Sequence, residues 1–253
     1  MMNEEVEIKE LEVKDVSTVV GLVRDSFHKN YIIPSIYRGK GINKFIKSEL
    51  ENKFSPYKYF VLYVNNKVAA YAEYKIFKKQ NMAFLNIVSV SADYKNQKLG
   101  SKILEYSRDF FQKQGFQSLE LDVFATNLVA VNWYKKYGFE RLSSKSFYKV
   151  VLNERIQNGN DINIRNFPQY KEIKKILGFY FLDTIIENRD FMFGVIEDDL
   201  IIRGMYDKSI NSHLAYLCKT LMLKNIYYIG NECQFSECEF IDQIDRMRLN
   251  IKL

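Results

Sequence analysis

The sequence of 253 residues contains no apolar run long enough to span a bilayer. It also shows no secretory pattern at its start, because Met1 to Glu12 is rich in glutamate. Hydrophobic residues make up 47% of the chain and charged residues 27%, which is typical of a soluble globular protein. We therefore expect a cytoplasmic protein without a membrane partner, long enough for one large domain or two modest ones.

Cysteine and histidine are both scarce. Three cysteines, Cys218, Cys233 and Cys238, are too few for a disulfide framework. Cys233 and Cys238 are close in sequence, but a metal site built on them would require two more ligands, and the chain has only His28 and His213 as imidazoles. We therefore expect ordinary thiols and no metal site.

The charge is unevenly distributed along the chain. Residues 1–152 carry 24 Lys and Arg against 16 Asp and Glu, a net charge of +8, whereas the remainder carries −2. A basic first part suits a cofactor with several phosphates, but we interpret most of these lysines as a solvated lysine-rich surface. Nucleic-acid binding would also use positive charge, yet no recognised binding motif supports it.

One stretch combines a strand, a polar loop and a helix start. A β-branched run ends, an amide-rich loop follows, and an amphipathic helix begins at about Gly100. The first N–H groups of a helix have no internal partner and carry partial positive charge, so this loop suits a phosphate, with Lys95, Lys98 and Lys102 nearby. Taken alone, the stretch is equally an ordinary connection between a strand and a helix. It reads Val88-Ser-Val-Ser-Ala-Asp-Tyr-Lys-Asn-Gln-Lys-Leu-Gly-Ser101.

A second motif follows a strand-like segment, Leu119 to Phe124. Its skeleton is Asn-x-x-Ala-x-x-x-Tyr-x-x-x-Gly-Phe, running from Asn127 through Tyr134 to Phe139. With the preceding loop, this motif resembles the GNAT superfamily, acyltransferases that move an acyl group from coenzyme A to an amine. The resemblance covers about the first 150 residues.

The loop motif departs from the family pattern, which is usually Arg or Gln-x-x-Gly-x-Gly or Ala. In this sequence Lys95 replaces the usual Arg or Gln, and Lys98 replaces the usual first glycine. Because glycine permits close backbone approach, a side chain at position 98 must point away from the phosphates. We expect cofactor affinity to be the property that this departure from the motif changes most.

The resemblance implies acetyl-CoA as co-substrate and a primary amine of a small molecule or peptide as acceptor. In the family the pantetheine arm lies between two splayed parallel strands and forms hydrogen bonds with one of them, as an extra strand would. The resemblance therefore implies that the arm bonds to the backbone of Val88 and Val90. It also places Tyr134 near the sulfur, where a phenol can donate a proton. The implied cofactor-binding residues are Val88, Ser89, Val90, Lys95, Asn96, Gln97, Lys98, Leu99, Gly100, Ser101, Asn127 and Tyr134.

The general base is less defined, because residues 83–88 lack the glutamate that some family members place there. Glu73, Glu120 and Asp122 lie on neighbouring predicted strands, where each could equally be a solvated or hydrogen-bonded strand residue. Among these Glu73 is the candidate catalytic base, and proton loss through ordered water would also work.

We predict an α/β (α+β) fold with a mixed central sheet of GNAT type. A crossover helix between residues 82–90 and 118–124 implies that these two strands are parallel, and Asn65-Asn66 predicts a tight turn between two antiparallel strands. The loop at residues 30–41 would border the acceptor site by resemblance, or its aromatics merely cover the core. The other predicted strands are 6–11, 59–64, 68–77, 139–142 and 147–152, and the predicted helices 13–29, 42–53 and 100–115.

We expect two domains. Residues 1–152 form the acyltransferase domain, and residues 153–253 form a smaller α+β domain that repeats part of the first pattern without the cofactor strand and loop. We interpret the second as a degenerate GNAT-like half that caps the acceptor pocket or forms a homodimer contact. The alternative function is a catalytically inactive GNAT-fold protein with a binding or regulatory role.

Overall fold

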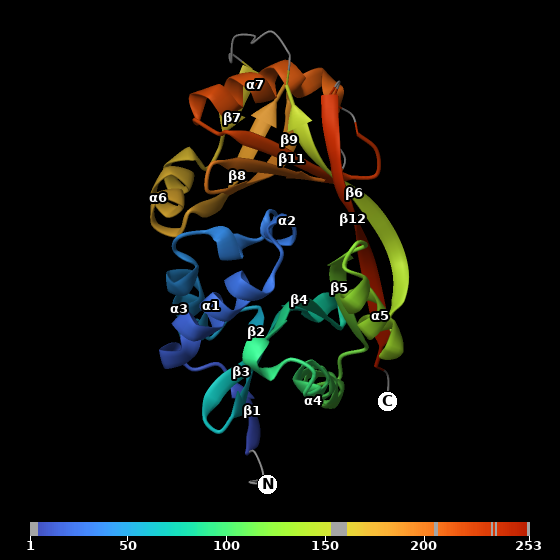
Figure 1. The fold of residues 1–253 in the computed structure, drawn as a ribbon. Helices are drawn as coiled ribbons and strands as arrows, with labels where there is room; N and C mark the ends of the chain where they lie inside the picture. Colours follow the sequence, from blue (N-terminus) through green and yellow to red (C-terminus); the bar gives the residue numbers. More distant parts are fainter. Residues whose placement is uncertain (1–4, 153–160, 205–206, 234, 236, 252–253) are drawn as a thin grey trace. The chain divides into compact units, whose positions relative to one another are not determined.

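A computed structural model describes residues 5–152, 161–204, 207–233, 235 and 237–251 (Figure 1). The chain divides into two compact units, each built from separate stretches of sequence. Within the described residues, no helix is long and apolar enough to cross a membrane. The first unit comprises Met1–His28, Asn43–Ser143 and Asp245–Leu253, and the second comprises Lys29–Ile42 and Ser144–Ile244.

The boundaries of these units differ from the single domain boundary predicted at Leu152. The segment Lys29–Ile42 belongs to the second unit, and the last residues of the chain return to the first. Two long strands, β6 (Glu140–Val151) and β12 (Glu237–Asn250), contribute residues to both units. Because the chain passes from one unit to the other within these strands, no linker of distinctive composition marks the boundary in the sequence.

The first unit contains a mixed sheet in the order β1-β2-β3-β4-β5-β12-β6. The β4 and β5 strands pair in parallel, as the crossover helix between them predicted. The remaining strands are β1 (Val6–Glu10), β2 (Tyr57–Val64), β3 (Lys67–Phe77), β4 (Met82–Val90) and β5 (Ser118–Phe124). The helices are α1 (Val16–Ser26), α3 (Ile42–Glu51), α4 (Leu99–Lys113) and α5 (Leu128–Lys136).

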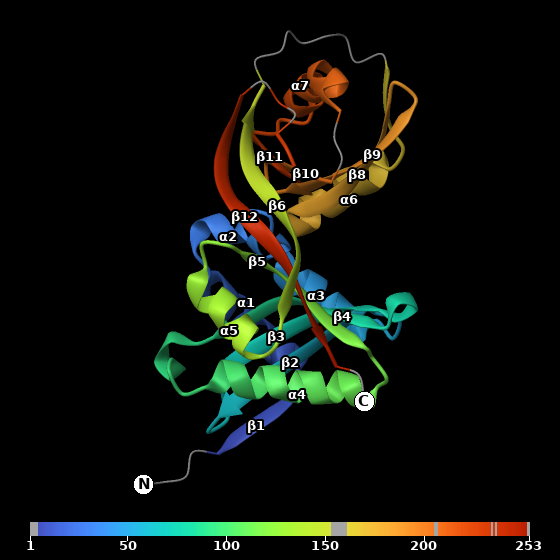
Figure 2. The ribbon, with the colours of Figure 1, turned by 90° about the vertical axis from the view of Figure 1, so that its right-hand side faces the viewer.

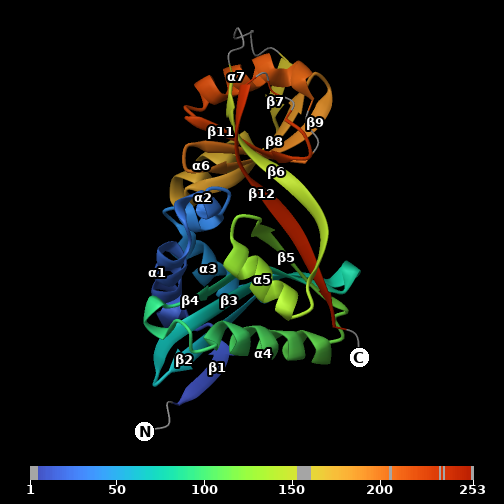
Figure 3. The same ribbon diagram turned by 45° about the vertical axis from the view of Figure 1, so that its right-hand side comes forward.

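The β2–β3 hairpin turns at Asn65 and Asn66, whose φ angles of 48° and 62° lie in the left-handed region. Asparagine tolerates this region better than most residues, so the turn predicted from this pair is confirmed. The β3 strand then pairs antiparallel with β4, which places β4 in the middle of the unit beside its parallel partner β5 (Figure 3).

The two faces of this sheet are covered by different helices (Figure 2). Alternation along β3 sends Ala70, Ala72 and Tyr74 to one face, where they share a core cluster with residues of α4. Tyr71 and Glu73 therefore point to the opposite face. The α1 helix covers that face, because the Ser89 hydroxyl donates to the α1 backbone and α1 contacts both β3 and β4.

The second unit contains the strand order β6-β11-β10-β9-β8-β7. Its strands and the helices α6 and α7 share one apolar core cluster. The sequence analysis missed β8 and β12, and it predicted two short strands where β6 is a single one. The elements are α2 (Lys29–Ile32), β7 (Ile162–Ile164), α6 (Phe167–Leu177), β8 (Phe179–Ile186), β9 (Arg189–Ile196), β10 (Asp199–Arg203), α7 (Asn211–Thr220) and β11 (Asn225–Gly230).

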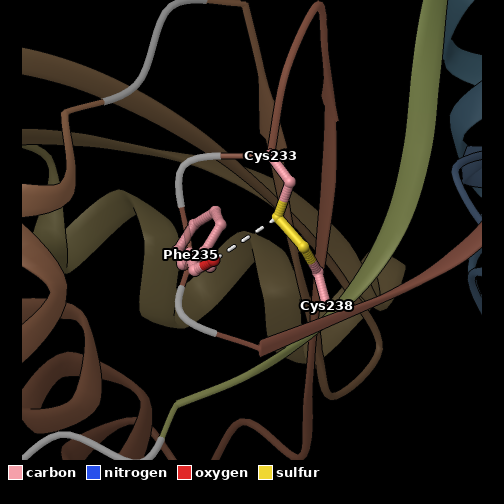
Figure 4. The surroundings of a disulfide bond; sticks show 3 residues. All are labelled: Cys233, Phe235 and Cys238. Atoms are coloured by element: carbon pink, nitrogen blue, oxygen red, sulfur yellow. Dashed lines mark hydrogen bonds between the residues drawn. A yellow bond between two sulfur atoms is a disulfide. The ribbon is translucent and has the colours of Figure 1, made fainter.

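Cys233, which follows β11, and Cys238, at the start of β12, form a disulfide (Figure 4). The expectation of ordinary thiols is therefore wrong for this pair. A separation of 5 residues along the sequence does not by itself indicate this pairing. Cys218 is a free, buried thiol on α7, and burial raises its pKa to about 12.

Candidate active site

An opening between β4 and β5 is the centre of the site. The parallel ladder joins Met82–Leu85 to Ser118–Leu121 and ends there, although β4 continues to Val90 and β5 to Phe124. The two strands therefore separate over their second halves. Because the ladder stops at Leu85, the edge of β4 after this residue is not paired with β5. This separation is the splay that the resemblance implied.

The register of β4 decides which of its peptide groups face this opening. The Ser91 N–H donates to the Ala69 carbonyl at 2.8 Å, and Ser89 lies opposite Tyr71. Because antiparallel pairing directs alternate residues to opposite sides, the peptide groups of Val88 and Val90 point away from β3 and towards the opening. These are the two residues expected to bond with the pantetheine arm. Their peptide groups point into the opening and are not paired with β3.

Ser89 occupies a different position. Its backbone lies in the ladder with Tyr71 of β3, and its hydroxyl donates to the Leu22 carbonyl of α1 at 3.4 Å. Among the residues expected to contact the cofactor, Ser89 is therefore held by β3 and α1, on the face opposite α4.

A β-bulge lies where the opening begins. Glu73 of β3 is opposite Ile87, whereas the next residue of β3 is opposite Leu85, so Asn86 is the extra residue of β4. A bulge places two successive side chains on the same face. Asn86 uses this geometry to donate from Nδ2 to Glu73 Oε1 at 2.8 Å.

The loop before α4 is shaped for close backbone approach. Asn96 and Lys98 have φ angles of 64° and 59°, in the left-handed region, and Lys98 is the residue before the first helical turn. Glycine adopts this conformation without a steric cost, which explains its usual presence at position 98 in the related motif. The side chains of Lys95, Asn96, Gln97 and Lys98 are exposed, whereas Leu99 is buried as an anchor of α4.

Replacing Lys98 with glycine should stabilise the protein by about 1 kcal/mol, because it removes the left-handed strain of a residue with a Cβ. Urea denaturation of Lys98→Gly against the wild type measures this. Lys95→Gly is the matched control, since Lys95 has a φ of −60° and should lose stability instead. A lower stability of Lys98→Gly would contradict the assignment of strain.

The α5 helix packs beside the first turns of α4 and joins the two sequence motifs. Trp133 Nε1 donates to Ser101 Oγ at 3.3 Å, and the Tyr137 hydroxyl donates to Glu105 Oε1 at 2.9 Å. A Cβ built on Gly100 would lie 3.5 Å from the Trp133 ring and 3.4 Å from Val90. The helix start, the β4 edge and α5 therefore converge at Gly100.

Asn127 is the N-cap of α5. Its side-chain oxygen accepts a hydrogen bond from the Ala130 N–H at 3.3 Å, which satisfies one of the unpaired amides of the first turn. This role explains the spacing of Asn and Ala in the motif. The side-chain Nδ2 remains a donor that is available to a ligand.

Tyr134 lies on the α4 side of the sheet. It is 6% exposed, and its ring contacts Trp133 and Phe139 with centroids 4.8 and 5.4 Å away. Within the described part of the chain, no residue hydrogen bonds with its hydroxyl. Burial raises the pKa of this phenol far above 10, so it remains protonated and can donate throughout the neutral range.

Glu73 lies on the opposite face of the sheet and is 3% exposed. It accepts hydrogen bonds from Asn86 and from the Tyr71 hydroxyl, the latter at 3.3 Å. Asn86 itself is exposed, so the polar group beside this carboxylate reaches the surface. A carboxylate on one face and a phenol on the other flank the sheet where β4 and β5 separate.

Glu120 and Asp122 serve a different purpose. Arg248 Nε donates to Glu120 at 2.8 Å, and Arg246 donates to Asp122 at 3.0 Å and to Glu120 at 3.3 Å. Both arginines belong to β12, which lies next to β5. These contacts tie both carboxylates to β12 and hold β12 against β5.

Sequence analysis did not identify Trp133, Asn86 or the two arginines of β12. Trp133 is the only tryptophan of the chain and lies within the second motif, which was a usable signal. Asn86 had no such signal in the sequence, because the position of a bulge depends on the register between two strands.

Comparisons with known proteins agree with this geometry. A model described as the Acetyltransferase (GNAT) family matches residues 37–139. The chain is 32% identical to the ribosomal protein bS18-alanine N-acetyltransferase of Escherichia coli (strain K12) over 109 residues, which cover 43% of this chain and 72% of that protein.

Two solved structures match almost the whole chain in fold. A tandem GNAT protein from the clavulanic acid biosynthesis pathway covers 98% of this chain and 99% of its own, with a TM-score of 0.70 at 9% identity. A GCN5-related N-acetyltransferase from Sphaerobacter thermophilus covers 98% and 96%, with a TM-score of 0.61 at 8% identity. Identities this low relate the folds and carry no information on substrates.

Proposed function

The chain belongs to the GNAT family of acetyltransferases, and we propose that it transfers an acetyl group from acetyl-CoA to a primary amine. The first unit supplies the acyltransferase site. The second unit, whose described residues contain no counterpart of the phosphate loop, has a supporting role.

The residues of this chain fit acetyl-CoA. The pyrophosphate would lie against the free amides of Leu99, Gly100 and Ser101 at the start of α4, with positive charge from Lys95 and Lys98 nearby. The pantetheine arm would take hydrogen bonds from the edge of β4 at Val88 and Val90. Asn127 would offer its Nδ2 to the cofactor or its bound water.

Acetyl-CoA supplies a thioester carbonyl that the acceptor nitrogen attacks, and the carbon–sulfur bond breaks as the amide forms. The Tyr134 phenol, kept neutral by burial, gives its proton to the leaving sulfur. Glu73, held in place by the hydrogen bond from Asn86, accepts the proton that the amine nitrogen loses, through ordered water. One proton is released to solvent for each ammonium acetylated, and Tyr134 then regains its own.

A single observation carries this proposal. The β4–β5 ladder stops at Leu85, and the free edge beyond it lies next to both the start of α4 and the helix that bears Tyr134. An opening with amides at one end and a protonated phenol beside it suits a long phosphorylated thioester.

Calorimetric titration with acetyl-CoA tests cofactor binding, and release of free thiol in the presence of an amine panel tests transfer. We expect saturable binding and thiol release that depends on the amine. Because the bacterial relative is a ribosomal protein bS18-alanine N-acetyltransferase, the panel should include peptides with an N-terminal alanine beside small amines. Absence of binding at high acetyl-CoA concentration would exclude the proposal.

The second candidate function is a binding or regulatory protein that keeps the fold without catalysis. The observation that favours it is Lys98 at a position where glycine usually lines the phosphates. Tight acetyl-CoA binding without thiol release across the whole amine panel would establish this function instead.

A further inference from the structure

Trp133, the only tryptophan of the chain, lies between the start of α4 and Tyr134. Its indole Nε1 donates to Ser101 Oγ at 3.3 Å, and its ring is 4.8 Å from the Tyr134 ring, centroid to centroid. An indole nitrogen can only donate, so an indole that is partly buried needs an acceptor beside it. Trp133 therefore contacts both the helix start that we assign to the pyrophosphate and the phenol that we assign to the sulfur.

The Ser101 side chain is engaged by α5. Its hydroxyl oxygen accepts from Trp133, and its proton goes to the Tyr137 oxygen. Burial raises the pKa of Tyr137, and this hydrogen bond from Ser101 lowers it in part. A serine hydroxyl has one proton, so Ser101 offers a ligand its backbone N–H in the first turn of α4 and not its side chain. The side chain thus connects the two helices.

Apolar packing alone would leave the register of α4 and α5 loosely defined. Ile103 and Leu104 of α4 share a core cluster with Val131 of α5, and apolar burial has no preferred direction. A hydrogen bond, by contrast, depends on both distance and angle. The bond between Trp133 and Ser101 is a directional contact at the first turn of α4, so it fixes where the amides of that turn lie relative to α5.

We propose that Trp133 is a positioning residue whose hydrogen bond with Ser101 sets the distance between the first-turn amides of α4 and the Tyr134 phenol. This inference rests on the proposed function and extends it, because a thioester held by its pyrophosphate would meet the phenol in one geometry. Displacing a reacting group by about 1 Å can slow a reaction by about a hundredfold. Loss of the bond should therefore lower kcat more than it weakens acetyl-CoA binding.

The indole N–H signal tests the bond without catalysis. Because the chain has one tryptophan, a proton–nitrogen correlation NMR spectrum of the full chain contains a single indole signal. We expect its proton to exchange with water about tenfold more slowly in the wild type than in Ser101→Ala, which corresponds to one hydrogen bond. Addition of acetyl-CoA should move this signal. Equal exchange rates, or a signal that bound acetyl-CoA leaves unchanged, would overturn the proposal.

Two variants measure the effect on catalysis. Ser101→Ala keeps the backbone N–H and removes the acceptor, and it should lower kcat about tenfold while the Kd for acetyl-CoA stays within about threefold of the wild-type value. Trp133→Phe keeps an aromatic ring and should lower kcat by a similar factor. Because both changes remove the same bond, the double variant should be no slower than Trp133→Phe alone. Losses that multiply in the double variant would overturn the proposal.

Tyr137→Phe is the matched control for this bond. It removes the hydrogen bond to Glu105, at 2.9 Å, and leaves Trp133 donating to Ser101. We therefore expect its kcat to stay within about twofold of the wild type. A loss in kcat equal to that of Ser101→Ala would overturn the proposal, because general contact between α4 and α5 would then explain the effect.

Thiol release and the indole signal separate this inference from the proposed function. If the wild type releases thiol and Ser101→Ala has the wild-type kcat, the positioning role is wrong and the acetyltransferase function holds. If Ser101 protects the indole proton and acetyl-CoA moves its signal, but no amine is acetylated, the connection between the helix start and α5 holds and the enzymatic function is wrong.

Discussion

Tyr134→Phe should lower kcat for acetyl transfer by about a hundredfold, the lower end of the usual contribution of a general acid. The ring, which packs against Trp133 and Phe139, is retained, so the fold and the Kd for acetyl-CoA should change little. The lost group is the one that we propose as the proton donor to the leaving sulfur. Stopped assays of free thiol, with calorimetry of acetyl-CoA for both proteins, separate chemistry from binding.

The pH profile gives a second readout of the same residue. Because burial raises the Tyr134 pKa far above 10, the proton donor should persist as pH rises through 10, where an ordinary phenol would ionise. We therefore expect wild-type kcat to show no alkaline decline from this group up to pH 10. A decline that disappears in Tyr134→Phe would show an ordinary pKa and contradict the assignment.

Tyr137→Phe is the matched control for both measurements. Tyr137 is the C-cap residue of α5, and its hydroxyl donates to Glu105 at 2.9 Å, at the surface of α4. Its removal should leave kcat within about twofold of the wild type, because a single exposed hydrogen bond contributes little to a distant reaction. Equal losses in the two variants would indicate damage to α5 instead of a lost acid.

The double variant Arg246→Met, Arg248→Met should destabilise the protein by about 3 kcal/mol, because it leaves a buried carboxylate without its charged partners. Glu120 is 5% exposed, and the guanidinium groups of both arginines contact it. Arg246 also lies over the Phe84 ring at 4.7 Å. Urea denaturation followed by circular dichroism measures the loss.

Adding Glu120→Gln to the double variant should recover most of this free energy, since an uncharged amide costs less to bury than a carboxylate. Arg108→Met is the matched control. Arg108 is an exposed arginine paired at 2.8 Å with Asp109, whose side chain is also exposed, so its loss should cost less than about 1 kcal/mol. A triple variant as unstable as the double one would show that packing of the arginine stems, and not charge, stabilises β12.

Much of the first unit could be predicted from local sequence. The Asn65-Asn66 turn, the strand at Met82–Val90 and the helix after Lys98 each depend on residues adjacent in sequence. The parallel β4–β5 pair followed from the crossover helix, because that connection has one favoured geometry. These features carry the family motifs, so the family could be recognised as well.

The place of β12 was harder to predict because its pairings are distant in sequence. β12 carries Asp242 and Asp245 in buried positions and alternates weakly, so its composition does not identify it as a central strand. Its place between β5 and β6 depends on Arg246 and Arg248 reaching Glu120 and Asp122, more than a hundred residues away in sequence.

The sequence by itself determined the family and the positions of the helix start and the tyrosine to which we assign the phosphate and the leaving sulfur, because each depends on short spacings along one strand or helix. Only the tertiary structure decided which peptide groups of β4 are free, since that depends on where the ladder with β5 ends. It also decided that Glu120 and Asp122 are ion-paired while Glu73 lies beside Asn86 and Tyr59, because the environment of a carboxylate is set by neighbouring strands.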